Sequence, residues 1–164
     1  MEYTIVPMGE GHLDQVEELE RTIFSSEAWS RRLLEEVRTI EGAVALCAEA
    51  GDGTVLGYAS AQIILDEGHI NNMAVRPQNR RQGIGSALLE ALRRKALEKH
   101  LIFLTLEVRA SNLGAQALYR KHGYAAVGRR KHYYDFPRED AILMTLEFEY
   151  EPESDEPGGV GTGL

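Results

Sequence analysis

The sequence has little sulfur and no long apolar run. Its one cysteine, Cys47, cannot form an internal disulfide, and a chain without disulfides fits a reducing compartment. The longest unbroken apolar run, residues 43–48, is far shorter than the roughly 20 residues that cross a bilayer. The first residues also lack the basic start and apolar stretch of a signal peptide. We therefore expect a cytoplasmic protein with no membrane segment.

Patterns typical of metal and nucleic-acid binding are missing as well. The five histidines and Cys47 show no metal-ligand spacing, so no metal is predicted. The 164 residues carry 18 Lys and Arg against 26 Asp and Glu, a net charge of −8. Because the chain is not basic overall and has no interleaved aromatic stripe, we expect no direct contact with nucleic acid. Nothing in the sequence predicts self-association, and we expect a monomer.

One globular domain and an acidic tail account for the composition. Hydrophobic residues make up 43% of the chain, and a domain of this size buries roughly 70% of the surface of its unfolded chain. Residues 149–164 contain five acids, no bases, two prolines and four glycines. We predict a domain over residues 1–148 and a disordered acidic tail over residues 149–164.

Hydrophobic periodicity predicts a mixture of strands and helices. Helices are expected over about 12–24, 31–40, 83–99 and 113–122, with Ser30 and Asn112 as N-caps and Gly123 in a left-handed conformation. Strands are expected over 3–6, 43–49, 55–65, 69–75, 101–108, 124–127 and 141–148, with a polar connection over 128–140 between the last two. This order implies an α/β domain in which helices pack on a mixed sheet.

A glycine turn precedes the longest predicted helix. Residues 81–86 read Arg-Gln-Gly-Ile-Gly-Ser, between a strand and the helix start. Glycines let successive N–H groups point inward, and the helix start adds unpaired donors, a combination that favours phosphate. The turn matches neither the dinucleotide fingerprint nor the Walker loop, and a plain tight turn is the alternative.

The segment Ile70–Leu89, which contains this turn, resembles the acetyl-CoA-binding core of the GNAT N-acetyltransferases. The resemblance implies a GNAT fold, with a mostly antiparallel sheet of about seven strands flanked by about four helices and splayed between the fourth and fifth strands. It implies acetyl-CoA as co-substrate. The residues expected to bind it are Met73, Ala74, Val75, Arg81, Gln82, Gly83, Ile84, Gly85, Ser86 and Asn112.

Four further segments resemble the RimI branch of this family, bacterial enzymes that acetylate the N-terminal alanine of a small-subunit ribosomal protein. They are Leu106–Asn112, Ala117–Tyr119, Arg130–Tyr134 and Arg138–Met144. The resemblance implies direct transfer to a protein N-terminus in a ternary complex. Ala28 departs from the branch, which commonly has proline before Trp-Ser, so the acceptor peptide stays open. A lysine, an antibiotic or a polyamine as acceptor, or a non-catalytic CoA-binding module, are the alternatives.

The resemblance assigns the general base to Glu107 and the general acid to Tyr119. Alternation along residues 102–109 points Glu107 away from the leucine face. A solvated partner of Arg109 is the alternative for Glu107, and a core position is the alternative for Tyr119. His69 is a rival base.

The acceptor groove is expected to combine aromatic and acidic side chains, which suit a cationic peptide N-terminus. The candidates for it are Trp29, Glu67, Tyr133, Tyr134 and Asp135.

Overall fold

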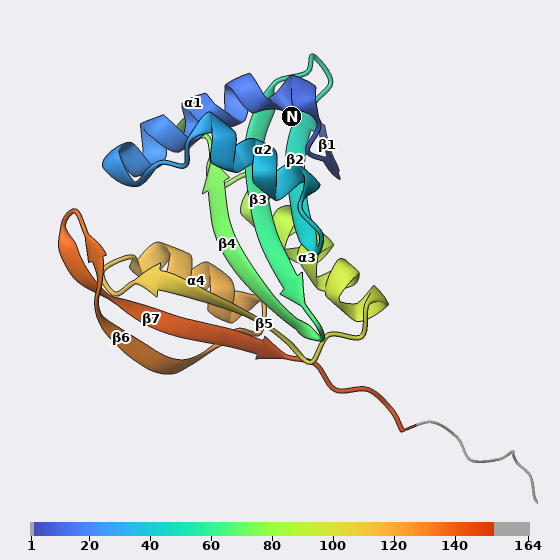
Figure 1. The fold of residues 1–164 in the computed structure, drawn as a ribbon, viewed down its shortest axis with the longest axis vertical. Helices are drawn as coiled ribbons and strands as arrows, with labels where there is room; N and C mark the ends of the chain where they lie inside the picture. The colour runs from blue at the N-terminus through green and yellow to red at the C-terminus, as the bar shows by residue number, and fades with distance from the viewer. Residues whose placement is uncertain (1, 153–164) are drawn as a thin grey trace, which may run out of the picture.

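The computed structural model describes residues 2–152 and contains a seven-stranded sheet with helices on both faces (Figure 1). The strands are β1 (Tyr3–Pro7), β2 (Ala43–Ala50), β3 (Val55–Ile64), β4 (Glu67–Val75), β5 (Phe103–Arg109), β6 (Ala125–Asp135) and β7 (Arg138–Glu147). The helices are α1 (Leu13–Phe24), α2 (Arg31–Thr39), α3 (Ile84–Glu98) and α4 (Leu113–Lys121), with 3-10 turns η1 (Glu10–His12), η2 (Ser25–Glu27) and η3 (Pro77–Asn79). The predicted order of strands and helices is confirmed.

The sheet opens between β4 and β5. The strand order is β1-β2-β3-β4-β5-β7-β6, and β4 with β5 is the parallel pair of an otherwise antiparallel sheet. The two strands pair only from Glu67 opposite Phe103 to His69 opposite Thr105, and beyond that point they diverge (Figure 1). The predicted splay between the fourth and fifth strands is therefore confirmed.

A bulge in β4 lies where the splay begins. Ser60 of β3 is opposite Asn72 and Ala61 is opposite Ile70, which leaves Asn71 without an opposing residue. An extra residue of this kind bends a strand and re-aims its side chains. From residue 73 to residue 75, β4 pairs with β3 on one side and faces the gap on the other.

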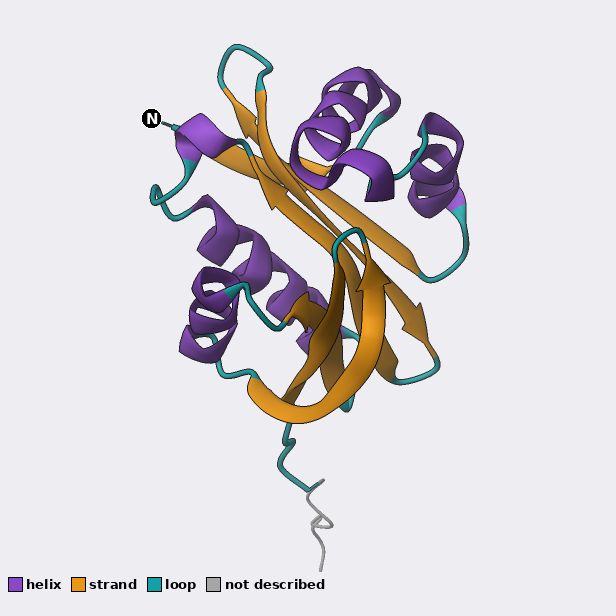
Figure 2. Ribbon diagram, turned by 90° about the vertical axis from the view of Figure 1, so that its left-hand side faces the viewer, coloured by secondary structure: helices purple, strands orange, loops and turns teal. Residues whose placement is uncertain are grey.

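Helices cover both faces of the sheet, so β3 is buried on both sides (Figure 2). On one face α1 and α2 pack against Cys47, Val55 and Tyr58, through Leu13, Val16, Leu19 and Leu34. On the other face α3 and α4 pack against Leu56, Leu104 and Leu106, through Ile84, Leu88, Leu92 and Tyr119. Burying one such leucine stabilises the fold by about 1.5–3 kcal/mol. These two cores fix the positions of β4 and β5.

The predicted helix ends have the expected chemistry. Ser30 Oγ accepts a hydrogen bond from the backbone N–H of Leu33 at 3.2 Å, and Asn112 Oδ1 accepts one from Ala115 at 3.1 Å. Gly123 follows α4 with φ +95°, a left-handed conformation that favours glycine. Both predicted N-caps are confirmed, and Asn112 begins α4 directly after β5.

The predicted polar connection over residues 128–140 is wrong. This segment belongs to the hairpin of β6 and β7. β6 lies at the edge of the sheet and exposes nearly all of its side chains. Two register shifts, between residues 126 and 128 and between residues 130 and 134, interrupt its pairing with β7. An exposed, bulged edge strand does not alternate polar with apolar residues, so the sequence carries no strand signal there.

The predicted tail begins close to the last contacts of the domain. Tyr150 stacks on His100 with ring centroids 4.7 Å apart, and its hydroxyl donates to the carbonyl of Leu101 at 2.7 Å. Residues 153–164, most of the predicted tail, lie outside the described residues. None of the helices within residues 2–152 has the length and apolar character that a membrane crossing requires.

Candidate active site

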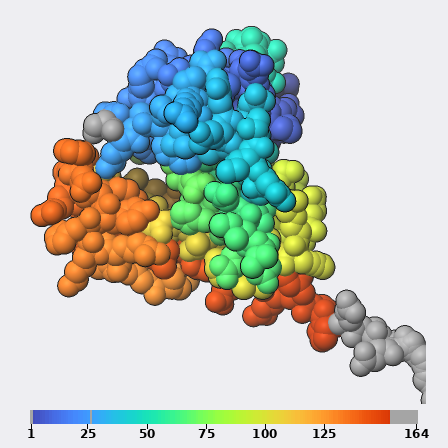
Figure 3. Space-filling model, viewed as in Figure 1, coloured from blue at the N-terminus to red at the C-terminus, as the bar shows by residue number. Residues whose placement is uncertain are grey.

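A hollow lies at the open end of the splay. In Figure 3 it separates the residues of α1 and α2 (blue) from the β6–β7 hairpin (orange). His69 of β4 lies opposite Thr105 at the last paired position, where the gap begins, and Glu107 of β5 lies two residues further along its strand. Segments far apart in the sequence therefore meet where the sheet opens.

Glu107 and His69 form one hydrogen-bonded unit. The alternation of β5 buries Leu104, Leu106 and Val108 and turns Glu107 to the opposite face, as predicted. Glu107 Oε1 lies 2.6 Å from His69 Nε2. Because a carboxylate only accepts hydrogen bonds, Nε2 carries the proton of this bond. The sequence presented these two residues as rival bases, but the structure makes them partners.

Two further residues orient this pair. His69 Nδ1 lies 2.9 Å from Asn71 Oδ1, at the unopposed position of the β4 bulge. Arg130 Nε of β6 donates to Glu107 Oε2 at 3.0 Å, so the carboxylate is held from both sides. The side chain of Glu107 is only 10% exposed, whereas His69 is 41% exposed. The carboxylate therefore lies beneath an imidazole that reaches solvent.

Arg109 does not pair with Glu107. Its guanidinium lies 2.7 Å from a carboxylate oxygen of Glu27 and 3.1 Å from one of Glu139. It also lies over the ring of Tyr134, 4.2 Å from the centroid. Arg109 thus links the connection between α1 and α2 to the β6–β7 hairpin, the two edges of the hollow.

Tyr119 is buried in α4 and keeps its proton. The side chain is 8% exposed, and burial raises the pKa of its hydroxyl to about 12. The ring lies 5.9 Å from that of Tyr124, and no hydrogen bond joins the hydroxyl of Tyr119 to any part of residues 2–152. A protonated phenol without a partner can donate to a ligand.

The glycine turn presents unpaired backbone donors at the start of α3. Gly83 has φ +83°, and no side chain caps the helix within the described residues. The first helical bond runs from Ala87 N–H to the carbonyl of Gly83 at 3.0 Å, which leaves the N–H groups of residues 84–86 without partners inside the helix.

The space around this turn fits a phosphate group. A Cβ on Gly83 would meet nothing within 4 Å, so the turn faces open space. A Cβ on Gly85 would lie 3.1 Å from Leu118 Cδ2, so a larger residue at this position would require Leu118 to shift. The side chain of Ile84 is buried, and Ser86 Oγ bonds His122 Nε2 at 2.8 Å. Arg81 and Gln82 are exposed beside the turn.

The backbone of Met73, Ala74 and Val75 borders the gap on the same side as this turn. Met73 Cε and Val75 Cγ2 lie within 4 Å of the Cβ position of Gly85, which places the strand beside the helix start. Asn112 is exposed, although its side chain already caps α4. The gap, the strand and the helix start are therefore contiguous, as an extended ligand with a phosphate would require.

The residues predicted for the acceptor groove are only partly brought together. Tyr133 and Tyr134 are in edge-to-face contact with ring centroids 5.0 Å apart. Trp29 is half-buried against the core of α1 and α2. Glu67 begins β4 at the closed end of the splay, opposite Phe103, and among the described residues no hydrogen bond or ion pair joins it to these aromatic residues.

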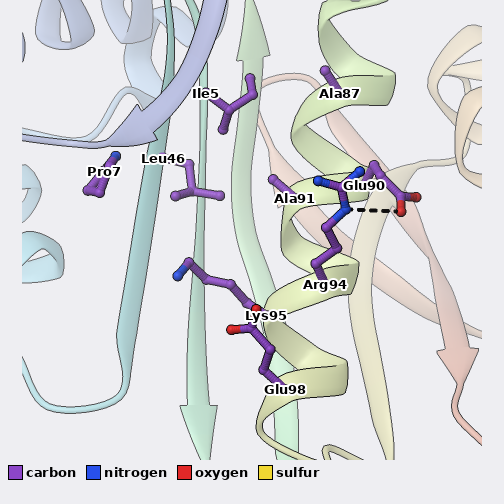
Figure 4. A pocket seen from close by; sticks show the side chains of 9 residues that line it. All are labelled: Ile5, Pro7, Leu46, Ala87, Glu90, Ala91, Arg94, Lys95 and Glu98. Atoms are coloured by element: carbon purple, nitrogen blue, oxygen red, sulfur yellow. Dashed lines mark ion pairs between the residues drawn. The ribbon is translucent and has the colours of Figure 1, made fainter.

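A second hollow lies away from this site (Figure 4). It measures about 410 Å³ between α3 and the strands β1 and β2. Its lining residues are Ile5, Pro7, Leu46, Ala87, Glu90, Ala91, Arg94, Lys95 and Glu98. None of the predicted site residues lines it, so the candidate active site is the gap between β4 and β5. No group of three metal-ligating side chains occurs within residues 2–152.

Known proteins share this architecture and much of this sequence. A Bacillus subtilis (strain 168) protein, named as a candidate ribosomal protein bS18-alanine N-acetyltransferase, is 36% identical over 132 residues, 80% of this chain and 87% of the relative. The crystal structure of the ribosomal-protein-S18-alanine N-acetyltransferase from Escherichia coli matches with a TM-score of 0.83 and 32% identity, covering 93% of this chain and 97% of that one.

A more distant structure, a GNAT family acetyltransferase from Elizabethkingia anophelis with acetyl-CoA bound, matches with a TM-score of 0.70 and 22% identity, over 89% of this chain and 98% of that one. At this identity the likeness is one of fold. The profile of the acetyltransferase (GNAT) family matches residues 13–124, which include the splayed strands, the glycine turn and Tyr119. The predicted resemblance is confirmed, and the chain belongs to the acetyltransferase (GNAT) family.

Proposed function

We propose that this acetyltransferase moves the acetyl group of acetyl-CoA to the N-terminal α-amine of a protein, and that its acceptor is the N-terminal alanine of a small-subunit ribosomal protein. The observation that carries the proposal is the unit of Glu107 and His69 at the point where β4 and β5 begin to diverge, with Tyr119 buried in the adjoining helix α4. The names of the relatives from Bacillus subtilis and Escherichia coli support the choice of acceptor.

Acetyl-CoA supplies the acetyl group as an activated thioester. The N–H groups at the start of α3, within the turn from Arg81 to Ser86, would hold its phosphates, since a helix start favours negative charge. The backbone of residues 73–75 would hold the pantetheine arm and the acetyl carbonyl, because it has no strand partner on the side of the gap. Asn112 adds a contact beside the start of α4.

Glu107 serves as the general base. It takes a proton from the attacking ammonium, directly or through one water, while His69 and Arg130 keep its carboxylate in place. An α-amine titrates near 7.7–8.0 and a lysine near 10.4, so the neutral fraction of the α-amine at pH 7 is several hundred times larger. A modest base therefore suffices for a protein N-terminus, which favours it over lysine as the acceptor.

Tyr119 serves as the general acid. The new N–C bond forms as the C–S bond of the thioester breaks, and the hydroxyl of Tyr119 gives its proton to the departing sulfur. Its pKa of about 12 keeps it protonated throughout the neutral range. Because its hydroxyl has no partner within residues 2–152, no existing hydrogen bond has to be broken first.

The acceptor peptide enters through the hollow between the two edges that Arg109 links. Trp29 on one edge, with Tyr133 and Tyr134 on the other, would contact its first residues. Glu67 lies at the closed end of the splay, where it would attract the cationic peptide N-terminus by its negative charge without contacting it.

The test is acetyl transfer by the purified protein to a peptide that begins with alanine. Release of the CoA thiol and mass spectrometry of the peptide are measured together, with four controls: the same peptide blocked at its N-terminus but with an internal lysine, a polyamine, an aminoglycoside, and no acceptor. We expect thiol release and one acetyl group only with the free N-terminal alanine. Modification of the lysine, polyamine or aminoglycoside instead, or acetyl-CoA binding without transfer to any of them, would show that the proposal is wrong.

A further inference from the structure

A carboxylate lies fully buried between α1 and the strands β3 and β4. Glu20 of α1 is 0% exposed, in the core between α1 and the sheet. Its Oε1 accepts the backbone N–H of Trp29 at 2.8 Å. Its Oε2 accepts the amide of Asn72 at 2.8 Å and the hydroxyl of Tyr58. Three donors from three different segments therefore converge on one side chain.

Packing alone does not explain an acid at this position. Burial raises the pKa of Glu20, and the hydrogen bonds from Trp29, Tyr58 and Asn72 oppose that rise. A buried carboxylate costs free energy unless every acceptor site is matched, and an apolar residue of similar volume is often as stable. The carboxylate of Glu20 therefore contributes a fixed geometry and not additional stability, since it holds its three partners in place relative to one another.

Two of the three partners lie in segments that border the proposed reaction site. Asn72 follows Asn71, the unopposed bulge residue whose amide oxygen faces His69, and His69 in turn bonds Glu107. Asn72 also precedes residues 73–75, which border the gap. Trp29 comes two residues after Glu27, whose carboxylate lies 2.7 Å from Arg109 at the edge of the acceptor hollow. One carboxylate thus connects the acetyl-CoA side of β4 with the acceptor side of the domain.

We infer that Glu20 is a positioning residue for acetyl transfer: it fixes the β4 bulge relative to the Trp29 segment, so that Glu107, the thioester and the peptide amine align. Glu20 does not reach the reacting atoms and is not itself a base. The inference rests on the proposed function, because it is the alignment of an N-terminal amine that the bulge and the Trp29 segment would control.

The variant Glu20→Gln tests this role with almost no change in volume. It replaces one of the two acceptor oxygens by an amide nitrogen that only donates, so the three hydrogen bonds that Glu20 accepts cannot all be kept. We expect kcat to fall on the order of 10- to 100-fold, the scale at which misplacement by about 1 Å affects a reaction.

A double variant tests whether the lost kcat can be restored. With Glu20→Gln and Asn72→Asp together, the carboxylate moves to β4 and the amide to α1, so that the hydrogen bond between the two elements re-forms with its direction reversed. The amide oxygen now at position 20 still accepts from the backbone N–H of Trp29. The hydroxyl of Tyr58 lies 3.1 Å from the side-chain amide of Asn72, so it can donate to the carboxylate now at position 72. We expect the double variant to regain most of the kcat that either single variant loses.

Leu34→Ala is the matched control for stability. Leu34 belongs to the same core and is fully buried, but it makes no contact with the network through polar atoms. Trp29 is the only tryptophan of the chain, so its fluorescence and its quenching by acrylamide report the segment that Glu20 holds. This readout needs neither acetyl-CoA nor a peptide.

The expected result is greater quenching of Trp29 and a lower kcat in Glu20→Gln, recovery of both in the double variant, and wild-type kcat in Leu34→Ala below its melting temperature. Wild-type kcat and quenching in Glu20→Gln would overturn the inference. A loss of kcat equal to that in Leu34→Ala and not rescued by Asn72→Asp would also overturn it. Failure of the wild-type protein on the alanine peptide would contradict the proposed function instead, and the quenching comparison would still decide whether Glu20 holds the Trp29 segment.

Discussion

Replacing Glu107 by glutamine separates base catalysis from every other contribution of the site. The change keeps the shape of the side chain, and an amide oxygen can still accept from Arg130, which lies 3.0 Å from the carboxylate. The protein should therefore stay folded, with a loss in the free energy of unfolding of about 1–2 kcal/mol. The lost function is proton removal from the acceptor, a general-base contribution of about 10²–10⁴-fold.

The loss of a general base predicts that kcat of Glu107→Gln rises with pH. With an α-amine pKa of 7.7–8.0, about 5% of the acceptor is neutral at pH 6.5 and about 80% at pH 8.5. Without the base, only the neutral fraction reacts, so kcat of Glu107→Gln should rise about 15-fold between these pH values. The wild-type enzyme should change less, because Glu107 deprotonates the bound ammonium. The variant is therefore most impaired at low pH.

The assay is thiol release from acetyl-CoA with an alanine peptide at saturation, measured at half-unit steps of pH. His69→Gln is the companion variant, since it removes the imidazole that lies 2.6 Å from Glu107 but leaves the carboxylate. We expect it to lose less activity than Glu107→Gln. Near-wild-type kcat of Glu107→Gln at pH 6.5 would refute the assignment and make His69 or a water the base.

Three further predictions concern the acid, the turn and the tail. Tyr119→Phe should lower kcat about 10²-fold at every pH below the thiol pKa, because a hydroxyl with a pKa near 12 is protonated throughout; a pH-dependent loss would argue against its role. Gly83→Val should abolish acetyl-CoA binding in calorimetry while circular dichroism stays native, since its side chain enters the open space at the turn and the left-handed φ costs only roughly 1–2 kcal/mol. Truncation after Pro152 keeps the contacts of Tyr150 and should leave melting temperature and turnover unchanged; lost turnover at equal folded fraction would assign the tail a role.

The sequence was sufficient for features that depend on local chemistry. Ser30 and Asn112 cap helices because their side chains meet N–H groups three residues away, and alternation along β5 places Glu107 on the correct face. β6 was missed in part because an exposed edge strand has no apolar face to reveal it. Periodicity describes burial, so it fails where a strand is not buried.

The contacts of the candidate site depend on tertiary pairing that periodicity does not encode. His69 meets Glu107 because β4 and β5 pair in parallel up to Thr105, a register that no local pattern specifies. Glu20 did leave a signal, since it lies four residues after Val16 and so shares its face of α1. An acid within an apolar stripe indicates a buried polar network, but the sequence contains 26 acids and this pattern alone does not distinguish Glu20 from the others.

The central claim is tested most directly by mass spectrometry of ribosomal proteins from cells with and without this protein. The account predicts that one small-subunit protein carries an acetyl group on its N-terminal alanine only when the protein is present. It also predicts that the Glu107→Gln variant restores little of this modification in cells that lack the wild-type protein. Identical N-terminal acetylation of every ribosomal protein in the two kinds of cell would contradict the claim.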